Sequence, residues 1–232
     1  MTAGRDWYKI VNHGASADVY VYDEIGYWGL TAGDFVQALG EITAGSINLH
    51  IYSPGGDVFD GVAIHNAILS HPATVAVHVD GLAASIASVI AMAGDTVTMG
   101  VGSQMMVHEA SGIAFGPASV MRQTADLLDK VTGNISGFYA RKAGGTADDW
   151  LAVMAAETWY NADEAVAAGL ADGLAEPASA PPVPMNRWDL SIFNYAGREQ
   201  APAPAIITPE PVQPVDVGSL TSRAIREAFG NA

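Results

Sequence analysis

The stretch Ile47–Asp57, INLHIYSPGGD, decides the fold, because an apolar run typical of a strand ends abruptly in two glycines. The run predicts a strand over residues 47–52, and Gly55-Gly56 predicts a turn. Apolar side chains then recur at helical spacing over residues 58–70. A strand, a tight loop and a helix in succession form the unit from which α/β folds are built.

A second unit of the same kind follows. Residues 74–79 predict a strand, and the small-residue segment Gly81–Ser88, GLAASIAS, leads into a buried helix predicted over residues 85–93. The other predicted elements are strands over residues 18–22, 96–99 and 104–108, and helices over 32–41 (capped by Thr31), 118–143, 146–155 (capped by Thr146) and 162–168. Because strands alternate with helices, we expect a largely parallel sheet with helices on both faces.

The composition argues against several classes of partner. The chain has 232 residues, half of them apolar, which is enough for one domain with a full core and an appendage. Lys and Arg number 10 against 25 Asp and Glu, so the net charge of −15 argues against nucleic acids and anionic membranes as partners. Such a charge could attract a basic substrate, although solubility explains it more simply.

Composition also bears on location. No cysteine is present, so disulfides and thiolate metal sites are excluded, which fits a cytoplasmic protein. Residues 1–6 lack the apolar core of a signal peptide. The longest nearly uncharged stretch, Gly81–Gly94, is too short to cross a bilayer and is better explained as a buried core helix.

The composition changes abruptly after Glu176, where prolines become frequent. Prolines disrupt both helices and sheet ladders, so residues 177–232 are expected to form an extended tail behind a domain of residues 1–176. Two islands interrupt this tail, an aromatic and apolar segment at 187–193 and a short predicted helix at 219–229. Either island could bind a partner or fold back on the domain.

Three segments carry the groups that acyl transfer needs. Ser85 stands at a predicted helix start, Gly55 and Gly56 can expose backbone N–H groups, and His108 ends a predicted strand. A serine beside a base, with backbone donors facing a developing oxyanion, is the arrangement of a serine hydrolase. Simpler explanations exist, since Ser85 could be only a helix cap and the glycines only a turn. Ser88, on the same predicted helix face, is a competing nucleophile.

The remaining histidines have ordinary explanations as surface or core residues: His13, His50, His65, His71 and His78. No histidine pair has the helical spacing of a zinc site, so we expect no metal. We also expect no organic cofactor.

Four separated segments agree, in order and spacing, with one known family. They are SPGG from Ser53, GLAASIAS from Gly81, MMVHEASG from Met105 and ETWYNADEAVAAGLAD from Glu157. Over roughly residues 15–175 the chain thus resembles the Clp-type serine peptidases, the ClpP family. The run VYDEIGYWGLTAGDF from Val21 is similar to the phage and prophage branch, which is associated with capsid maturation.

The resemblance implies a role for individual residues. Ser85 would be the nucleophile and His108 the base, and the backbone N–H groups of Gly56 and Ile86 would form the oxyanion hole. The family's third triad member is an aspartate just before a short strand, and Glu157 holds that position here. A glutamate can orient an imidazole, but its longer side chain needs a different backbone offset. The alternatives are Asp149, Asp163 and Asp172, which are more simply explained as helix caps or turn residues.

The resemblance also implies an architecture. The family fold is crotonase-like, with repeated β-β-α units, a largely parallel sheet and a long helix that interlocks two stacked rings around a chamber. Residues 118–143 stand where that helix is expected. Such a homo-oligomer would act on unfolded polypeptides. The N-terminal loops and clefts that bind an ATPase unfoldase in some members are not identifiable here, so an ATPase partner is not implied.

The function that follows is a serine endopeptidase working through an acyl-enzyme on Ser85, with phage capsid or scaffold proteins as the substrates that the resemblance suggests. One alternative is a crotonase-like acyl-CoA hydratase or isomerase, which would need carboxylate acid–base groups and a basic CoA site. The scarcity of Lys and Arg argues against it. Another alternative is a non-catalytic capsid assembly module whose function lies in residues 177–232.

Overall fold

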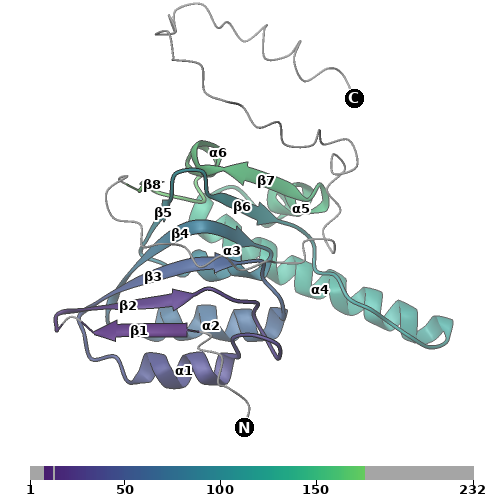
Figure 1. Cartoon of the computed structure of the whole chain (residues 1–232). Coiled ribbons are helices and arrows are strands. Elements are labelled where there is room, and N and C mark those ends of the chain that lie inside the picture. The colour runs from purple at the N-terminus through teal and green to yellow at the C-terminus, as the bar shows by residue number, and fades with distance from the viewer. Residues whose placement is uncertain (1–7, 13, 176–232) are drawn as a thin grey trace, which may run out of the picture. The chain divides into compact units, whose positions relative to one another are not determined.

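A mixed eight-stranded sheet organises residues 8–12 and 14–175, the part of the chain that this computed structural model describes (Figure 1). In chain order the elements are β1 (Tyr8–Asn12), β2 (Ser16–Val21), α1 (Ala32–Gly40), β3 (Ser46–Ser53), α2 (Val58–Ser70), β4 (Thr74–Ala84), α3 (Ile86–Ala91), β5 (Thr96–Met99), β6 (Gln104–Val107), α4 (Ala118–Ala143), α5 (Ala147–Ala155), β7 (Thr158–Asn161), α6 (Ala162–Ala167) and β8 (Gly173–Leu174).

Parallel pairing builds the centre of the sheet. The strand order is β1-β2-β3-β4-β5-β8, and β6 pairs with β4 and carries β7. Strands β2 to β5 pair in parallel, whereas β1 pairs antiparallel with β2, and β7 with β6. The prediction of a largely parallel α/β sheet is confirmed. The β-β-α order occurs in β1-β2-α1 and β5-β6-α4, with two β-α units between them.

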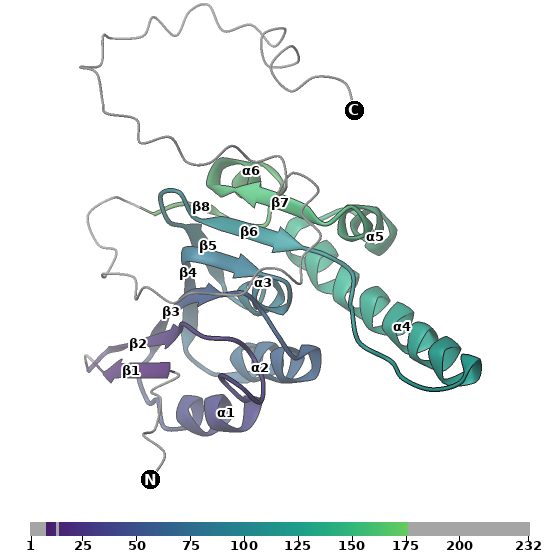
Figure 2. The ribbon, with the colours of Figure 1, turned by 45° about the vertical axis from the view of Figure 1, so that its right-hand side comes forward.

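Helices α1, α2 and α3 lie on one face of this sheet (Figures 1 and 2). Along β3 every second residue is buried, as Leu49 is, and the residues between them, such as Asn48 and His50, are only half-buried. The expectation that helices cover both faces is therefore wrong for the central strands. The half-buried face is polar and its groups bond to one another: Asn48 donates to the Asp18 carboxylate, and His50 Nδ1 lies 2.8 Å from Asp80 Oδ2.

Local capping explains where the helices begin. The Thr31 hydroxyl accepts from the first turn of α1, as predicted. Asp57 caps α2, because its carboxylate accepts the N–H groups of Phe59 and Asp60. Thr146 and Asp149 form a capping box at α5. The Asp57 cap directly follows Gly56, so it fixes the point at which the glycine loop turns into a helix.

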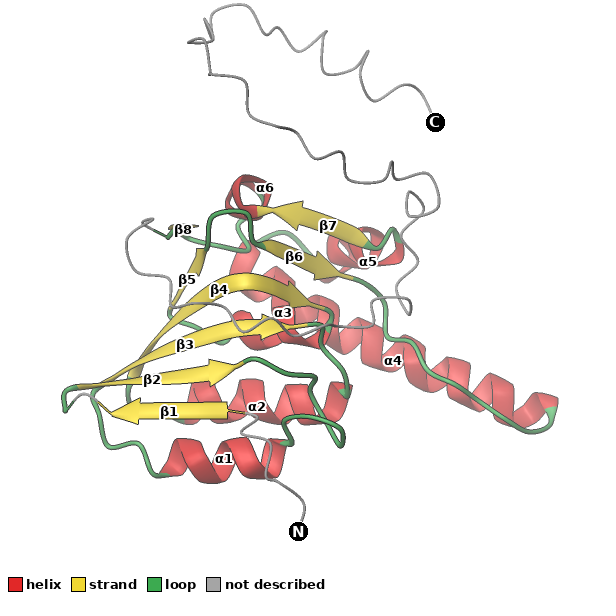
Figure 3. Ribbon diagram, in the orientation of Figure 1, coloured by secondary structure: helices red, strands yellow, loops and turns green. Residues whose placement is uncertain are grey.

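Helix α4 extends beyond the sheet, and the sequence analysis predicted both of its ends (Figure 3). Its buried side chains lie in the C-terminal half: Val131, Thr132, Ile135, Ser136 and Tyr139. In the first half even apolar side chains such as Met121 and Leu127 are exposed. Within the described part of the chain, the first half therefore leaves much of its apolar surface exposed.

Other boundaries differ from the prediction. Strand β4 continues to Ala84, through a segment expected to be a loop, because residues 82–84 gain a new partner in β6. Helix α3 begins at Ile86 and is shorter than expected. Strands β1 and β8 were not predicted. Both are short and pair with a single neighbour, so tertiary pairing rather than local pattern defines them.

The predicted tail, residues 177–232, and its two islands lie outside the described residues. Within the described part of the chain, no helix combines the length and the apolar character needed to span a membrane.

Candidate active site

Ser85 occupies a sharp one-residue turn between β4 and α3. Its φ of 54° and ψ of −129° are unfavourable for a residue with a side chain. The Ser85 N–H donates to the Met106 carbonyl over 2.9 Å, which fixes the turn against β6. Such a turn holds a side chain clear of both flanking elements. The strained backbone therefore presents the Ser85 hydroxyl to the space beside β6.

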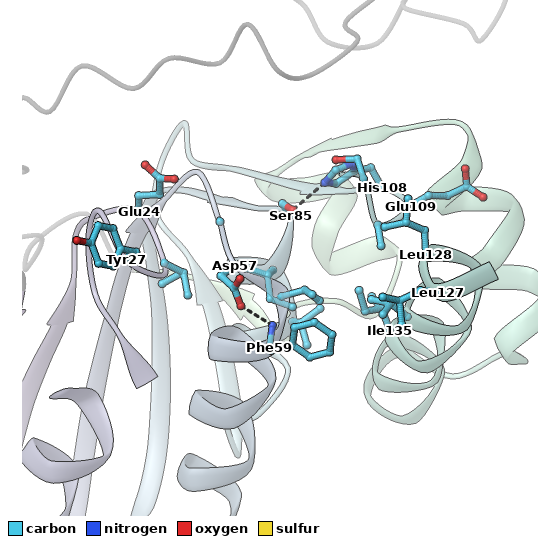
Figure 4. Close-up of a pocket in the computed structure, with 18 of the residues that line it drawn as sticks. Glu24, Tyr27, Asp57, Phe59, Ser85, His108, Glu109, Leu127, Leu128 and Ile135 are labelled. Carbon is cyan, nitrogen blue, oxygen red and sulfur yellow. Dashed lines mark hydrogen bonds between the residues drawn. The ribbon is translucent and has the colours of Figure 1, made fainter. Parts of the chain in front are cut away.

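His108 meets Ser85 in that space. Strand β6 lies parallel to the end of β4, with Ala84 opposite Met106, so the residues that follow the two strands emerge together. The Ser85 Oγ lies 2.7 Å from His108 Nε2, a hydrogen-bonding distance (Figure 4). The pair stands at the carboxyl ends of parallel strands, where α/β sheets commonly present reactive groups.

Burial determines the protonation state of His108. Removal from water disfavours an imidazolium and lowers the pKa of His108 below its ordinary value, while the negative charge of Glu157 opposes this shift. Burial is the larger effect. The ring is therefore neutral at pH 7, with a lone pair available to accept the serine proton.

The pairing of β6 with β7 brings Glu157 close to Ser85 and His108. Strand β7 runs antiparallel to β6, with Val107 opposite Thr158. Continued by one step, this register sets Glu157 beside His108. Glu157 has a φ of 47°, so the backbone departs from the strand at that residue.

The glycine loop lies directly against the Ser85 turn. A Cβ added to Gly55 would stand 2.7 Å from the Ser85 Cβ and 3.1 Å from the Ile86 nitrogen. A Cβ on Gly56 would stand 2.0 Å from the Ile25 carbonyl oxygen. Both glycines have a positive φ, 93° and 144°. No residue with a side chain fits either position, which explains the Gly-Gly pair.

The loop also orients its backbone groups. The Gly55 carbonyl accepts from the Ile25 N–H, and the Asp57 N–H donates to the Ile25 carbonyl. Both neighbours of Gly56 are therefore hydrogen-bonded to Ile25. The N–H of Gly56 itself then points away from Ile25. Ile86 is the first residue of α3, so its N–H has no acceptor within the helix. Gly56, Ser85 and Ile86 line the same cavity.

That cavity has a volume of about 480 Å³. Apolar residues from α3 and α4 line it, among them Val89 and, from α4, Leu128 and Ile135 (Figure 4). Its other lining residues include three acidic residues, Glu24, Asp57 and Glu109, and the exposed aromatic residues Tyr27, Trp28 and Phe59. A peptide side chain could enter the apolar part while the backbone lies along the polar part.

Ser88 does not reach the cavity. Its side chain is fully buried, and its hydroxyl donates to the Ser85 carbonyl over 2.6 Å. A second hydrogen bond, 2.8 Å long, joins it to the Tyr139 hydroxyl on α4. The sequence analysis missed this use of Tyr139, which helical spacing marks only as one residue of a long helix. Through its hydrogen bond to the Ser85 carbonyl, Ser88 thus stabilises the Ser85 turn.

The alternative acidic residues have structural positions. The Asp149 carboxylate accepts from the Thr146 N–H in the α5 capping box. The Asp172 carboxylate accepts from the Val97 N–H and pairs with Lys142. Asp163 is exposed in the first turn of α6. The cap role expected of these residues holds for Asp149, whereas Asp172 links β5 to α4 and Asn161, not Asp163, caps α6.

The other described histidines are engaged elsewhere. His65 is buried against the Phe138 ring, with a centroid separation of 4.4 Å. His50 and His78 stack on the half-buried face of the sheet, and His71 accepts from Ala73 at the end of α2. His13 lies outside the described residues. Among residues 8–12 and 14–175, no three His, Asp or Glu side chains gather as a metal site would require.

Comparison with known proteins identifies the family to which this site belongs. The sequence model of the Clp protease family matches residues 34–178, well over half of the chain. The chain belongs to the Clp protease family. The match spans the glycine loop, the Ser85 turn, His108 and Glu157, so all the candidate residues lie within the Clp protease region.

Individual relatives agree with this assignment. ATP-dependent Clp protease proteolytic subunits from two strains of Bacteroides fragilis (NCTC 9343 and YCH46) are each 32% identical over 128 residues, or 54% of this chain. The matched region covers 62% and 58% of those relatives, so this Clp-family chain matches less than two thirds of their length.

A solved structure shares the fold. A mutant of ClpP1 from Listeria monocytogenes superimposes with a TM-score of 0.62, covering 68% of this chain and 91% of that one at 23% sequence identity. This likeness supports the predicted Clp-type α/β fold. At that identity it concerns the fold alone.

Proposed function

We propose that the chain is a serine endopeptidase that hydrolyses peptide bonds through an acyl-enzyme on Ser85. The observation that carries this proposal is the 2.7 Å contact between the Ser85 hydroxyl and the neutral His108 ring at a strained turn. Membership of the Clp protease family supports it. An acyl-CoA hydratase would need carboxylates at the reacting centre, whereas here a serine and a histidine meet there.

The proposed reaction begins with His108. Its Nε2 accepts the Ser85 proton as Oγ attacks the peptide carbonyl carbon, and the Glu157 carboxylate stabilises the imidazolium that forms. The carbonyl oxygen becomes negative and accepts hydrogen bonds from the N–H groups of Gly56 and Ile86. His108 then gives its proton to the leaving amine, the C–N bond breaks, and an ester remains on Ser85.

Water completes the cycle. His108 removes a proton from the water molecule as its oxygen attacks the ester carbonyl, again producing an oxyanion beside Gly56 and Ile86. Collapse of this intermediate breaks the ester bond. The proton on His108 returns to Ser85 Oγ, so the enzyme regains its starting state and the peptide leaves with a new carboxylate. No metal ion or organic cofactor takes part in this scheme.

The substrate and assembly proposals rest on the family. We propose that the chain forms a homo-oligomeric ring, and the exposed apolar side chains of the first half of α4, Met121 and Leu127, support an interface there. The similarity of residues 21–35 to the phage branch supports capsid or scaffold proteins as substrates. Sedimentation of the full chain tests the first proposal, and incubation with its candidate capsid protein tests the second.

Peptide hydrolysis tests the central proposal. Full-length protein is incubated with a panel of fluorogenic peptides, alongside the variants Ser85→Ala and His108→Gln. Each variant should lose at least roughly a thousandfold in rate. Ser70→Ala, which removes an exposed hydroxyl at the end of α2, is the matched control and should retain full activity. Undiminished hydrolysis by Ser85→Ala would overturn the proposal.

A further inference from the structure

Glu157 and Trp159 form a hydrogen-bonded pair at the start of β7. The Trp159 indole Nε1 donates to Glu157 Oε1 over 3.3 Å. An indole N–H can only donate, so the direction of this bond is unambiguous. The two residues are two positions apart, and Glu157 stands at the positive-φ turn that directly precedes β7.

The indole is itself held in place. Trp159 packs against a small buried cluster made of Leu82, Ala84 and Met106. Leu82 and Ala84 lie at the end of β4, next to Ser85, and Met106 lies in β6, two residues before His108. The Trp159 ring is therefore anchored to the two strands that carry the nucleophile and the base.

A glutamate at this position needs such an anchor more than an aspartate would. Its side chain has one more rotatable bond, so holding the carboxylate in one orientation costs more conformational entropy. A donor on Oε1 restricts the orientations that the carboxylate can adopt. The influence of Glu157 on His108 depends on that orientation, because attraction between charges falls with distance.

We propose that Trp159 is a positioning residue for the reaction at Ser85, whose indole N–H holds the Glu157 carboxylate beside His108. The proposal rests on the proposed peptidase function and assigns to Trp159 a role beyond packing. In this proposal Trp159 acts through Glu157, whose carboxylate it orients.

The variant Trp159→Phe tests this assignment, because it keeps an aromatic ring in the cluster and removes the N–H together with the five-membered ring that carries it. Trp150→Phe is the matched control: it also removes an indole hydrogen bond, from Nε1 to the Gly144 carbonyl, and Trp150 does not line the cavity. The readout is the rate of Ser85 modification by a fluorophosphonate across pH. Trp159→Phe should react roughly tenfold more slowly at the plateau and with a lower apparent pKa, since the carboxylate no longer supports the His108 imidazolium.

A double-mutant cycle separates positioning from packing. In a Glu157→Gln background, Trp159→Phe should cause no further slowing. A wild-type pH profile in Trp159→Phe, an equal change in Trp150→Phe, or equal slowing in both backgrounds would each overturn the proposal. NMR titration of the His108 ring makes the same measurement without turnover and should show a lower pKa in Trp159→Phe. If the wild type is not modified at Ser85, the peptidase proposal fails, and this titration still decides whether Trp159 positions Glu157.

Discussion

The Ser88 hydroxyl lies 2.8 Å from the Tyr139 hydroxyl and links the long helix α4 to the strained turn at Ser85. Ser88 uses its own proton to donate to the Ser85 carbonyl, so Tyr139 is the donor in the second bond. Both side chains are buried, and burial raises the pKa of Tyr139, so its hydroxyl stays protonated and able to donate. Helix α4 thus supports the Ser85 turn through Ser88.

Removing this link should destabilise the fold. Ser88→Ala leaves the buried Tyr139 hydroxyl without that acceptor and frees the Ser85 carbonyl, and we expect a loss of about 1–3 kcal/mol in unfolding free energy. Denaturant unfolding measures it. The double variant Ser88→Ala/Tyr139→Phe should cost less than the sum of the single variants, because both partners are removed together. Strictly additive losses would show that the two hydroxyls are not coupled.

The glycine loop should not tolerate a side chain. Gly56→Ala would place a methyl group 2.0 Å from the Ile25 carbonyl oxygen at a φ of 144°, so the loop must shift. We expect a loss of roughly 3 kcal/mol or more in stability, with loss of peptide hydrolysis. Gly133→Ala, at an exposed position in α4 with open space around it, should instead stabilise the helix by up to about 1 kcal/mol. Wild-type activity and stability in Gly56→Ala would contradict the proposed oxyanion loop.

Stability should fall as the pH drops below about 6.5, the ordinary pKa of a histidine. Burial lowers the pKa values of His65, His78 and His108 in the folded chain. Between the lowered and ordinary values, the unfolded chain binds more protons, so protonation favours unfolding. Denaturant midpoints measured from pH 7.5 to 5 should decline, and His65→Gln should flatten the decline. Constant stability across this range would contradict the assignment of neutral buried rings.

The acidic part of the cavity should favour basic peptides. Glu24, Asp57 and Glu109 line it, and none of its described lining residues is Lys or Arg. A peptide with Lys beside an apolar residue should therefore show a kcat/KM roughly two- to fivefold above its Glu counterpart at low salt, and the difference should shrink at high salt. Glu109→Gln should reduce this preference, and Glu41→Gln, outside the cavity, should not. A preference for acidic peptides would exclude this electrostatic model.

Much of the fold was predictable because local patterns agree with tertiary structure. The prediction for α2 was correct at both ends, since the Asp57 cap and the apolar spacing of its sequence determine it locally. The end of β4 was not predictable, because residues 82–84 extend the strand only through pairing with β6. The partly open sheet face also went unrecognised. Its half-buried histidines and tyrosines carry no pattern that distinguishes mutual bonding from cover by a helix.

The candidate site was predictable in its residues but not in its supporting contacts. His108 and the glycines stand next to strand ends that local patterns mark, and Ser85 stands where they mark the start of a helix. The link from Ser88 to Tyr139 spans 51 positions, and no local pattern predicts it. The hydrogen bond from Trp159 to Glu157 is local in sequence. Its relevance to the candidate site depends on the pairing of β7 with β6, which carries the chain to His108. Contacts of this kind require the folded chain.

The most direct test of the central claim is to locate a covalent fluorophosphonate adduct by peptide mass spectrometry of the full-length protein. A single adduct on Ser85, absent from Ser85→Ala and strongly slowed in His108→Gln, is the predicted result. Modification at another residue, or equal modification of Ser85→Ala, would contradict the assignment of Ser85 as the nucleophile.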